Sequence, residues 1–200
     1  MKGAVLSELQ ERKKILRKEA VTFRRCLSFE KRIAASQRMI ASLVKETAYQ
    51  AAKTVFAYVS MPEEIALDDF LERAIADGKI LVIPLIQKKG VMDVIRLRRL
   101  EDLVPDAYGI KTVRKEAREI VPPESIDLIV VPGAAFDVRG GRLGLGAGFY
   151  DRFMRERATG AKRIALAFDG LIYPEVPMTK HDERVDLILT EKRRIETYAR

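Results

Sequence analysis

A glycine-rich segment at residues 140–152, GGRLGLGAGFYDR, carries the residue types from which phosphate-binding sites are built. Glycines alternate along it between Arg142 and Arg152, and an aromatic pair leads into Asp151. Directly upstream, residues 125–133 (SIDLIVVPG) predict a buried parallel strand that ends in a turn. Glycine lets the backbone approach phosphate oxygens, N–H groups at a helix start favour negative charge, and arginine adds forked donors. The segment therefore predicts an anion-binding loop between a strand and a helix.

Spacing excludes two better-known glycine motifs. A dinucleotide-binding loop follows G-x-G-x-x-G, and no third glycine stands in register after Gly148. A P-loop that starts at Gly141 would need Lys and Ser or Thr where the chain has Ala147 and Gly148. Two interpretations remain, a third kind of phosphate site or a tight connection without a ligand, and the arginines and the aspartate favour the first.

Composition limits the classes of protein that the chain can represent. With 200 residues, of which 48% are apolar and 33% charged, it fits one globular domain with a full core. No apolar run approaches the ~20 residues that span a bilayer, and the start turns charged early, so we expect a cytoplasmic protein without a signal peptide. One Cys and one His exclude an internal disulfide and a zinc site. Any metal would be a hard cation held by carboxylates and phosphate oxygens, which indicates Mg²⁺.

The formal charge of +8 is concentrated near the start of the chain. Such a cluster suits a nucleic acid, a polyanionic small molecule or a solvated helix face, and charge alone does not decide among them. Aromatic residues do not alternate with the basic ones, which argues against a platform for single-stranded nucleic acid. The basic residues concerned are Arg12, Lys13, Lys14, Arg17, Lys18, Arg24, Arg25, Lys31, Arg32 and Arg38.

Hydrophobic periodicity predicts strands that alternate with helices, and hence an α/β three-layer domain with a mainly parallel sheet. We expect a single domain over residues 1–200, with a helical segment of about residues 5–52 packing on it and Ser28 as the N-cap of its second helix. Residues 101–124, which contain prolines and a glycine, look like irregular connection. The strands are expected at 54–60, 79–84, 91–97 (after Gly90, antiparallel at an edge), 127–131, 163–168 and 185–190, and further helices at 67–77 and 150–157.

Ligands of such sheets gather beyond the carboxyl ends of the strands. The distinctive loops follow predicted strands, at residues 60–64, 132–151 and 168–182. Lys13 and Arg17 are four residues apart and so share one helix face, from which both could reach one anion. This convergence favours a site at the glycine loop.

In the strand before the glycine loop and in the loop itself, the chain resembles the 5-formyltetrahydrofolate cyclo-ligase family. The resemblance rests on P-G-x-x-F-D within residues 127–137 and on R-L-G-x-G-x-G-[FY]-Y-D at residues 142–151, a long and specific combination. It covers nearly the whole chain. Further matches are Lys13 with Arg17 (K-x-x-x-R), residues 60–64, Met92, residues 167–168, His181 with Asp182, and residues 185–186.

The resemblance implies an ATP- and Mg²⁺-dependent ring closure that turns 5-formyltetrahydrofolate into 5,10-methenyltetrahydrofolate. In that scheme the formyl oxygen is phosphorylated, N10 attacks the activated carbon, and phosphate leaves. Arg142 is implied as the catalytic residue, and Asp151 and Asp186 as the Mg²⁺ ligands. The implied ATP-binding residues are Lys13, Arg17, Arg142, Leu143, Gly144, Leu145, Gly146, Ala147, Gly148, Phe149 and Tyr150, and the implied substrate-binding residues are Met61, Glu64, Phe149 and Tyr150.

Several features admit a plainer role or depart from the family pattern. His181 with Asp182 could simply fix a loop, and Asp137 could cap the turn after Phe136. This chain departs from the common family pattern at residues 109–113, at residues 169–171 and at Thr179. These positions lie in loops expected to touch the substrate, so the resemblance defines the substrate less firmly than the ATP site.

Two other functions compete with the cyclo-ligase. One is a relative that keeps the ATP site and acts on another formylated or carboxylated molecule; the other is a basic nucleic-acid-binding module on the same fold. As partners we expect ATP and a reduced folate, with or without a polyglutamate tail, and neither nucleic acid nor membrane. We expect a monomer.

Overall fold

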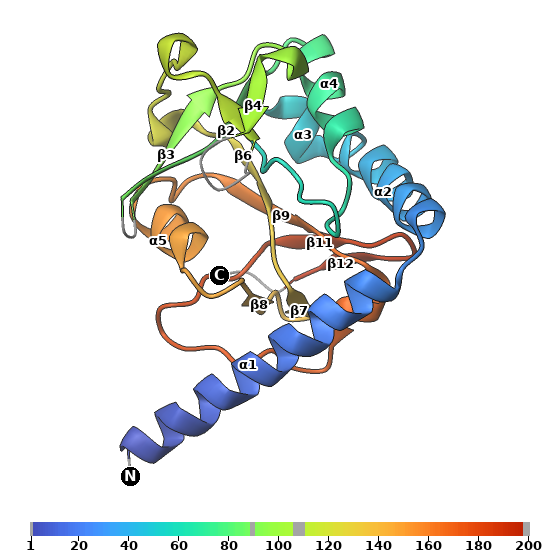
Figure 1. The fold of residues 1–200 in the computed structure, drawn as a ribbon, viewed down its shortest axis with the longest axis vertical. Coiled ribbons are helices and arrows are strands. Elements are labelled where there is room, and N and C mark those ends of the chain that lie inside the picture. The colour runs from blue at the N-terminus through green and yellow to red at the C-terminus, as the bar shows by residue number, and fades with distance from the viewer. Residues whose placement is uncertain (1, 89–90, 106–110, 198–200) are drawn as a thin grey trace.

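A seven-stranded sheet forms the centre of the protein, which we describe from a computed structural model of residues 2–88, 91–105 and 111–197 (Figure 1). The strand order is β12-β11-β9-β6-β1-β2-β3; the inner strands pair in parallel, while β3 and β12 are antiparallel at the two edges. The predicted mainly parallel α/β sheet and its antiparallel edge strand at 91–97 are thus confirmed. The bounds are β1 Thr54–Phe56, β2 Ile80–Lys88, β3 Val91–Arg96, β6 Leu128–Val131, β9 Lys162–Leu166, β11 Leu187–Leu189 and β12 Arg194–Glu196.

Helices cover both faces of this sheet, because successive strand residues point to opposite sides. On one face Val55 of β1 belongs to a core that includes Leu43 and Phe70, whereas the next residue, Phe56, packs with Phe153 on the other face. The first face is covered by α2 and α4 and the second by α5, so the predicted three layers are present. The helices are α1 Lys2–Cys26, α2 Phe29–Leu43, α3 Thr47–Ala51, α4 Asp68–Ala76 and α5 Phe149–Glu156.

The first helix runs across one end of the molecule and extends beyond it (Figure 1). Its inner residue Leu16 packs with Ala135, Leu143 and Val176. The chain then turns, and Ser28 caps α2, its hydroxyl accepting a hydrogen bond from the N–H of Lys31 at 3.3 Å. The predicted N-cap is therefore confirmed, and α1 is placed to face the loops at that end of the molecule.

Two small sheets lie in segments that the sequence analysis treats as loops. Strands of two or three residues carry too little hydrophobic alternation to be recognised, so the expectation of irregular structure was wrong there. These short strands form because they pair with residues elsewhere in the chain. They are the pair β4 Leu103–Pro105 with β5 Lys111–Val113, and the sheet β10 Ile172–Tyr173, β7 Ala135–Asp137 and β8 Arg142–Leu143; short 3₁₀ helices are η1 Leu100–Asp102, η2 Lys115–Ala117, η3 Pro123–Ser125 and η4 Asp169–Leu171.

Asp137 caps the β7–β8 turn, as predicted. Its Oδ1 accepts hydrogen bonds from the N–H groups of Arg139 and Gly141, each at 2.9 Å, and its Oδ2 accepts one from Val176 at 2.8 Å. The carboxylate thereby fixes the hairpin from which the glycine loop departs. The predicted turn at Gly90 and the family departure at Gly109 lie outside the described residues.

Two aspartates stand directly before parallel strands and bind the start of a neighbouring strand. The Oδ2 of Asp127 accepts from the N–H groups of Lys53 (2.8 Å) and Thr54 (2.9 Å), and the Oδ2 of Asp186 accepts from that of Arg163 (2.8 Å). Each carboxylate satisfies backbone donors at the amino edge of the sheet, so both have a structural role there.

No helix in the described part of the chain is long and apolar enough to cross a membrane.

Candidate active site

A cavity of about 620 Å³ lies between α1, the glycine loop and the segment before β11. The residues that form it come from three separate parts of the chain, and many of them are polar or glycine. They are Leu9, Gln10, Lys13, Arg17, Gly144, Gly146, Gly148, Asp151, Met178, Thr179, Lys180, His181 and Asp182.

Helix α1 contributes the two predicted cations to this cavity. Lys13 is only 4% exposed, and its Nζ lies 2.5 Å from the Oδ2 of Asp182. Arg17, one turn later, donates from Nε to the carbonyl oxygen of Gly144 at 2.8 Å. The structure thus brings both residues to the glycine loop, as their spacing on one helix face predicts.

The glycine loop adopts backbone conformations that require glycine at two positions. Gly146 has φ +117° and Gly148 has φ +67°, in the left-handed region that side chains disfavour. Gly148 is also the N-cap of α5, so the first N–H groups of the helix begin at the cavity wall. Between the glycines, Leu145 is 65% exposed. The loop therefore presents backbone to the cavity, as an anion site needs.

Other predicted members of the loop do not line the cavity. Leu143 is buried in the core beside Leu16, and Ala147 is exposed outside the cavity wall. Phe149 is half-buried, and the Arg152 guanidinium lies over its ring at 5.6 Å from the centroid.

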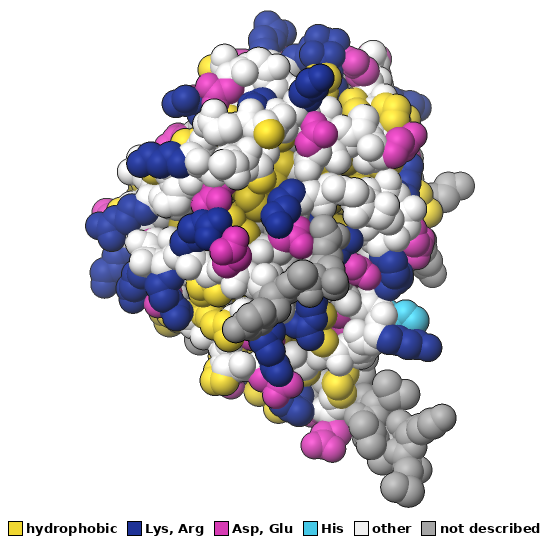
Figure 2. Space-filling model, turned by 180° about the vertical axis from the view of Figure 1, so that it is seen from behind, with side chains coloured by type: hydrophobic (Ala, Val, Ile, Leu, Met, Phe, Trp, Pro, Cys, Tyr) yellow, Lys and Arg dark blue, Asp and Glu magenta, His cyan; other side chains and the backbone are white. Residues whose placement is uncertain are grey.

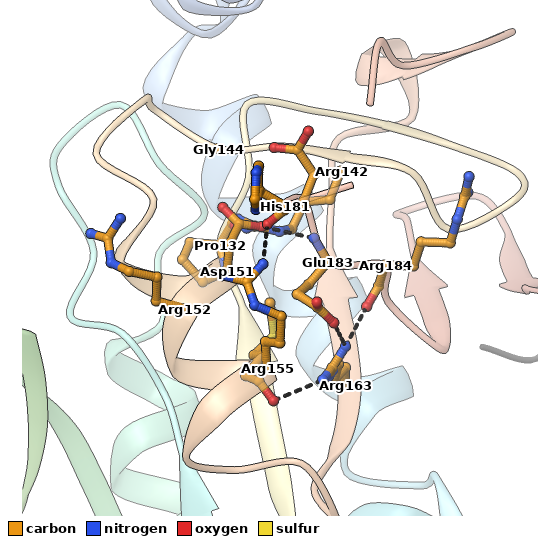
Figure 3. A network of polar contacts seen from close by, with 12 residues as sticks. Pro132, Arg142, Gly144, Asp151, Arg152, Arg155, Arg163, His181, Glu183 and Arg184 are labelled. Atoms are coloured by element: carbon orange, nitrogen blue, oxygen red, sulfur yellow. Dashed lines mark hydrogen bonds and ion pairs between the residues drawn. The ribbon is translucent and has the colours of Figure 1, made fainter. Parts of the chain in front are cut away.

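Arg142 lies behind the cavity wall, with a side chain only 2% exposed. Its Nη1 donates to the carbonyl oxygen of Pro132 at 3.0 Å and its Nη2 to the Oδ1 of Asp151 at 2.5 Å (Figure 3). In this structure the guanidinium orients Asp151. A direct contact between Arg142 and phosphate stays a prediction.

Two carboxylates, those of Asp151 and Asp182, line the cavity. The backbone N–H of Glu183 donates to the Oδ1 of Asp151 at 3.0 Å, which brings the residue after Asp182 against Asp151 (Figure 3). The Oδ2 of Asp182 accepts a hydrogen bond from Lys13. It also accepts one from the N–H of Thr179 at 2.5 Å and one from the Thr179 hydroxyl at 2.8 Å. Burial raises the pKa of Asp182, but the bonds from Lys13 and Thr179 outweigh it and the pKa is lowered, so the group is anionic at neutral pH.

The position of Asp186 differs from the one predicted for a metal ligand. It does not line the cavity, and its carboxylate binds the N–H of Arg163 at the start of β9. The cavity carboxylate is Asp182, which the sequence analysis treats as part of a loop-fixing pair with His181. β11 begins at Leu187 rather than at residue 185, so Asp186 stands at the amino edge of the sheet, whereas Asp182 lies on the preceding loop, which lines the cavity.

His181 also lines the cavity, and it is exposed. Its backbone is held on both sides, because its N–H donates to the Thr179 hydroxyl and its carbonyl oxygen accepts from Arg155 at 2.8 Å. These bonds agree with a loop-fixing role for this segment.

The donor set fits Mg²⁺ bound together with phosphate. Among the described residues, the Oδ2 of Asp151 and the Oδ1 of Asp182 take part in no hydrogen bond, so each carboxylate keeps one oxygen for a cation. No group of three His, Cys, Asp or Glu that could hold a metal occurs in the ranges the structure covers. A cation there would therefore complete its octahedron with ligand oxygens and water, which is the usual habit of Mg²⁺.

A second polar cluster surrounds Glu64, which lies in the loop after β1 and faces Arg24 of α1. Glu64 accepts from the Met61 N–H at 3.0 Å, and its other oxygen lies 3.7 Å from the Arg24 guanidinium. Tyr150 stacks on Phe56 with ring centroids 5.5 Å apart, and its buried hydroxyl has no hydrogen-bond partner among the described residues. The cluster thus holds a carboxylate and a donor that can recognise a ligand.

The hydroxyl groups of this cluster stay protonated at neutral pH. Burial raises the pKa of Tyr150, and Tyr58 and Glu64 raise it further. Burial likewise raises the pKa of Tyr58, with Glu64 adding to the effect. The structure brings Glu64, Tyr150 and Met61 together as the sequence analysis predicts; nothing in the sequence distinguished Tyr58 from an ordinary strand residue.

Known proteins resemble this chain over most of its length. The model of the 5-formyltetrahydrofolate cyclo-ligase family matches residues 9–191. A 5-formyltetrahydrofolate cyclo-ligase of Mus musculus is 32% identical over 192 residues, covering 90% of this chain and 93% of its own. One of Mycolicibacterium smegmatis is 33% identical over 150 residues, covering 72% and 76%.

Solved structures show the same fold. The 5,10-methenyltetrahydrofolate synthetase of Aquifex aeolicus superposes with a TM-score of 0.82 at 29% identity and covers 94% of each chain. That of Mycoplasma pneumoniae gives a TM-score of 0.73 at 22% identity, covering 90% of this chain and 98% of its own, and supports the fold alone. Since the family model spans almost the entire sequence, and Lys13, Arg17 and the glycine loop of the resemblance line the cavity, the chain belongs to the 5-formyltetrahydrofolate cyclo-ligase family.

Proposed function

We propose that this protein converts 5-formyltetrahydrofolate to 5,10-methenyltetrahydrofolate, consuming ATP and releasing ADP and phosphate. The observation that carries the proposal is the cavity in which Lys13, Arg17 and the backbone of the glycine loop face Asp151 and Asp182. Membership of the cyclo-ligase family and the names of its relatives support the reaction.

The triphosphate of ATP occupies this cavity in the proposal. Lys13 and Arg17 supply positive charge, and the loop amides near Gly144, Gly146 and Gly148 supply donors, so charge that develops during phosphoryl transfer is stabilised by groups already in place. Arg142 acts through Asp151, which it orients. Leu145, exposed between two glycines, is free to cover the bound nucleotide.

Asp151 and Asp182 would hold Mg²⁺ against the phosphate oxygens. When bound, the cation neutralises charge on the transferring phosphoryl group. Lys13, which contacts Asp182 from the other side, keeps that carboxylate ionised and aligned.

The folate lies in the cluster around Glu64. Glu64 accepts hydrogen bonds from the amino and N–H edge of the pterin, and the Tyr150 hydroxyl donates to the ligand and so gains the partner it lacks. Met61 and Phe149 supply apolar contact. The formyl oxygen takes the terminal phosphoryl group of ATP, and ADP leaves. N10 then attacks the formyl carbon to form the new C–N bond, its proton passes to solvent, and the C–O bond breaks as phosphate leaves.

The experiment that tests this is absorbance in the band of the methenyl-folate product, with purified protein, 5-formyltetrahydrofolate, ATP and Mg²⁺. We expect a rise that needs all the components and disappears when any one is omitted. The Arg142→Ala variant should lose turnover, whereas Arg139→Ala should keep it, because Arg139 is exposed on the same hairpin and pairs with Glu175 outside the cavity.

Two results would contradict the proposal. Nucleotide binding without product would favour a relative with another acceptor. Steeply salt-dependent binding to polyanions that survives in Arg142→Ala, again without product, would favour a nucleic-acid-binding module. Basic side chains are spread over the face shown in Figure 2 with acidic ones among them, which does not favour a dedicated nucleic-acid surface there.

A further inference from the structure

A buried ion pair lies beside the cavity and takes no part in the proposed reaction (Figure 3). It joins Arg163, on β9, to Glu183, in the segment before β11; the Nη1 of Arg163 is 2.7 Å from the Oε2 of Glu183. The side chains are 3% and 19% exposed. An arginine this deeply buried needs strong partners, so the pair must fix whatever it joins.

The guanidinium of Arg163 joins two elements of the active site. Besides Glu183 it donates to the carbonyl oxygen of Arg184 at 3.3 Å and, through Nη2, to that of Met154 at 2.9 Å. Met154 lies on α5, the helix that carries Asp151. Arg163 therefore ties residues 183 and 184 to α5.

That connection sets the relative position of both cavity carboxylates. The N–H of Glu183 donates to Asp151 at 3.0 Å, and Asp182 is the residue immediately before it. If the 183–184 segment shifts away from α5, Asp151 loses a hydrogen bond and Asp182 moves with the backbone. Partners one layer behind metal ligands commonly change metal affinity by about 10- to 100-fold when they are removed.

We propose that Arg163 and Glu183 are positioning residues that hold Asp151 and Asp182 at the spacing needed to bind Mg²⁺ with a nucleotide. The inference rests on the proposed function, since it assumes that these two carboxylates bind the cation. The inference goes beyond the proposed function because neither Arg163 nor Glu183 lines the cavity or touches a substrate.

The test compares Glu183→Ala with Asp93→Ala. Asp93 is a matched control, because it is 18% exposed, lies 2.6 Å from Arg157 at the end of the same helix, and does not line the cavity. Calorimetry measures the affinity for a non-hydrolysable ATP analogue with Mg²⁺ and with EDTA, and the ratio of the two affinities is the Mg²⁺ enhancement. We expect Glu183→Ala to reduce this enhancement about tenfold or more while the affinity in EDTA stays within about twofold of wild type. Asp93→Ala should change neither, and Glu183→Gln, whose amide oxygen still accepts from Arg163, should recover part of the loss.

Each outcome is decisive. A folded Glu183→Ala variant with the wild-type enhancement overturns the inference and leaves the proposed function standing. If Glu183→Ala does not fold, Arg163→Lys carries the test, because a single ammonium cannot make the separate contacts to residues 154, 183 and 184; unchanged enhancement there overturns the inference too. Wild-type protein that binds the analogue equally well with Mg²⁺ and with EDTA would refute the proposed cation site, and the positioning role with it.

Discussion

Asp182 and Asp186 lie four residues apart, and we expect the first to bind Mg²⁺ and the second to have only a structural role. Replacing each in turn by asparagine tests this difference. In Asp182→Asn the ammonium of Lys13, whose side chain is 6% exposed, keeps only a neutral amide as its partner. Hydrogen bonds to charged groups contribute about 1.5–3 kcal/mol, so the free energy of unfolding should fall by about that amount. For a chain of this size this is a decrease in Tm of about 3–12 °C. The same substitution removes one of two proposed Mg²⁺ ligands, and we expect the apparent affinity for Mg²⁺ to fall by at least about 100-fold, beyond what positioning residues give.

Asp186→Asn should behave differently. The amide oxygen of asparagine can still accept from the Arg163 N–H, so the loss of stability should stay near 1 kcal/mol and Mg²⁺ dependence should not change. Thermal unfolding and Mg²⁺ titration of turnover measure both effects. The reasoning is refuted if Asp186→Asn, while folded, loses Mg²⁺ dependence and Asp182→Asn keeps it.

Three further predictions concern pH, stability and the loop. Folding lowers the pKa of Asp182, so the contribution of this carboxylate to stability is complete above its unfolded pKa of about 3.9 and is lost as the pH falls through the folded pKa. When Tm is measured from pH 6 downward, it should therefore fall less steeply in Asp182→Asn than in wild type, and equal slopes would contradict this. Tyr49→Phe removes a hydroxyl that donates to Asp77 at 2.7 Å, so unfolding should show a loss of about 1–2 kcal/mol with turnover unchanged, and a fall in turnover of the folded variant would argue against a purely structural bond. In Gly146→Ala the added Cβ has room, 3.7 Å from the Arg17 guanidinium, but a φ of +117° is strained for alanine. The KM for ATP should therefore rise about 5- to 10-fold while the KM for the folate is unchanged. An unaltered KM for ATP would show that the loop does not need this conformation.

Much of the fold could be predicted from the sequence, because the buried parallel strands leave a strong signal. Residues 127–131 are apolar without alternation, which is typical of a strand buried on both faces, and β6 is found there as Leu128–Val131. Ser28 was recognisable as a cap and Lys13 with Arg17 as one helix face. These features depend on neighbours close in sequence, and they are confirmed.

The features that escaped prediction depend on contacts between distant residues. Strands β7, β8 and β10 exist only because they pair with one another across 30 residues or more of chain or around a turn capped by Asp137. The partner of Arg142 could not be known, and its guanidinium orients Asp151 instead of lining the cavity. The resemblance implies Asp186 as a metal ligand, but the carboxylate that lines the cavity is that of Asp182. Its contact with Lys13 joins residues 169 positions apart and leaves no signal in the local sequence.

The bond between Lys13 and Asp182 joins residues 169 positions apart in the chain. During synthesis α1 emerges well before the segment with Asp182, and most strands of the central sheet lie between them in the chain, so the cavity forms only after those strands have been made. On the proposed function, the nucleotide in this cavity binds only the finished molecule, and it stabilises the whole fold in proportion to the logarithm of its concentration over its Kd. On that proposal, nucleotide supply is a determinant of how long each completed chain resists unfolding and proteolysis.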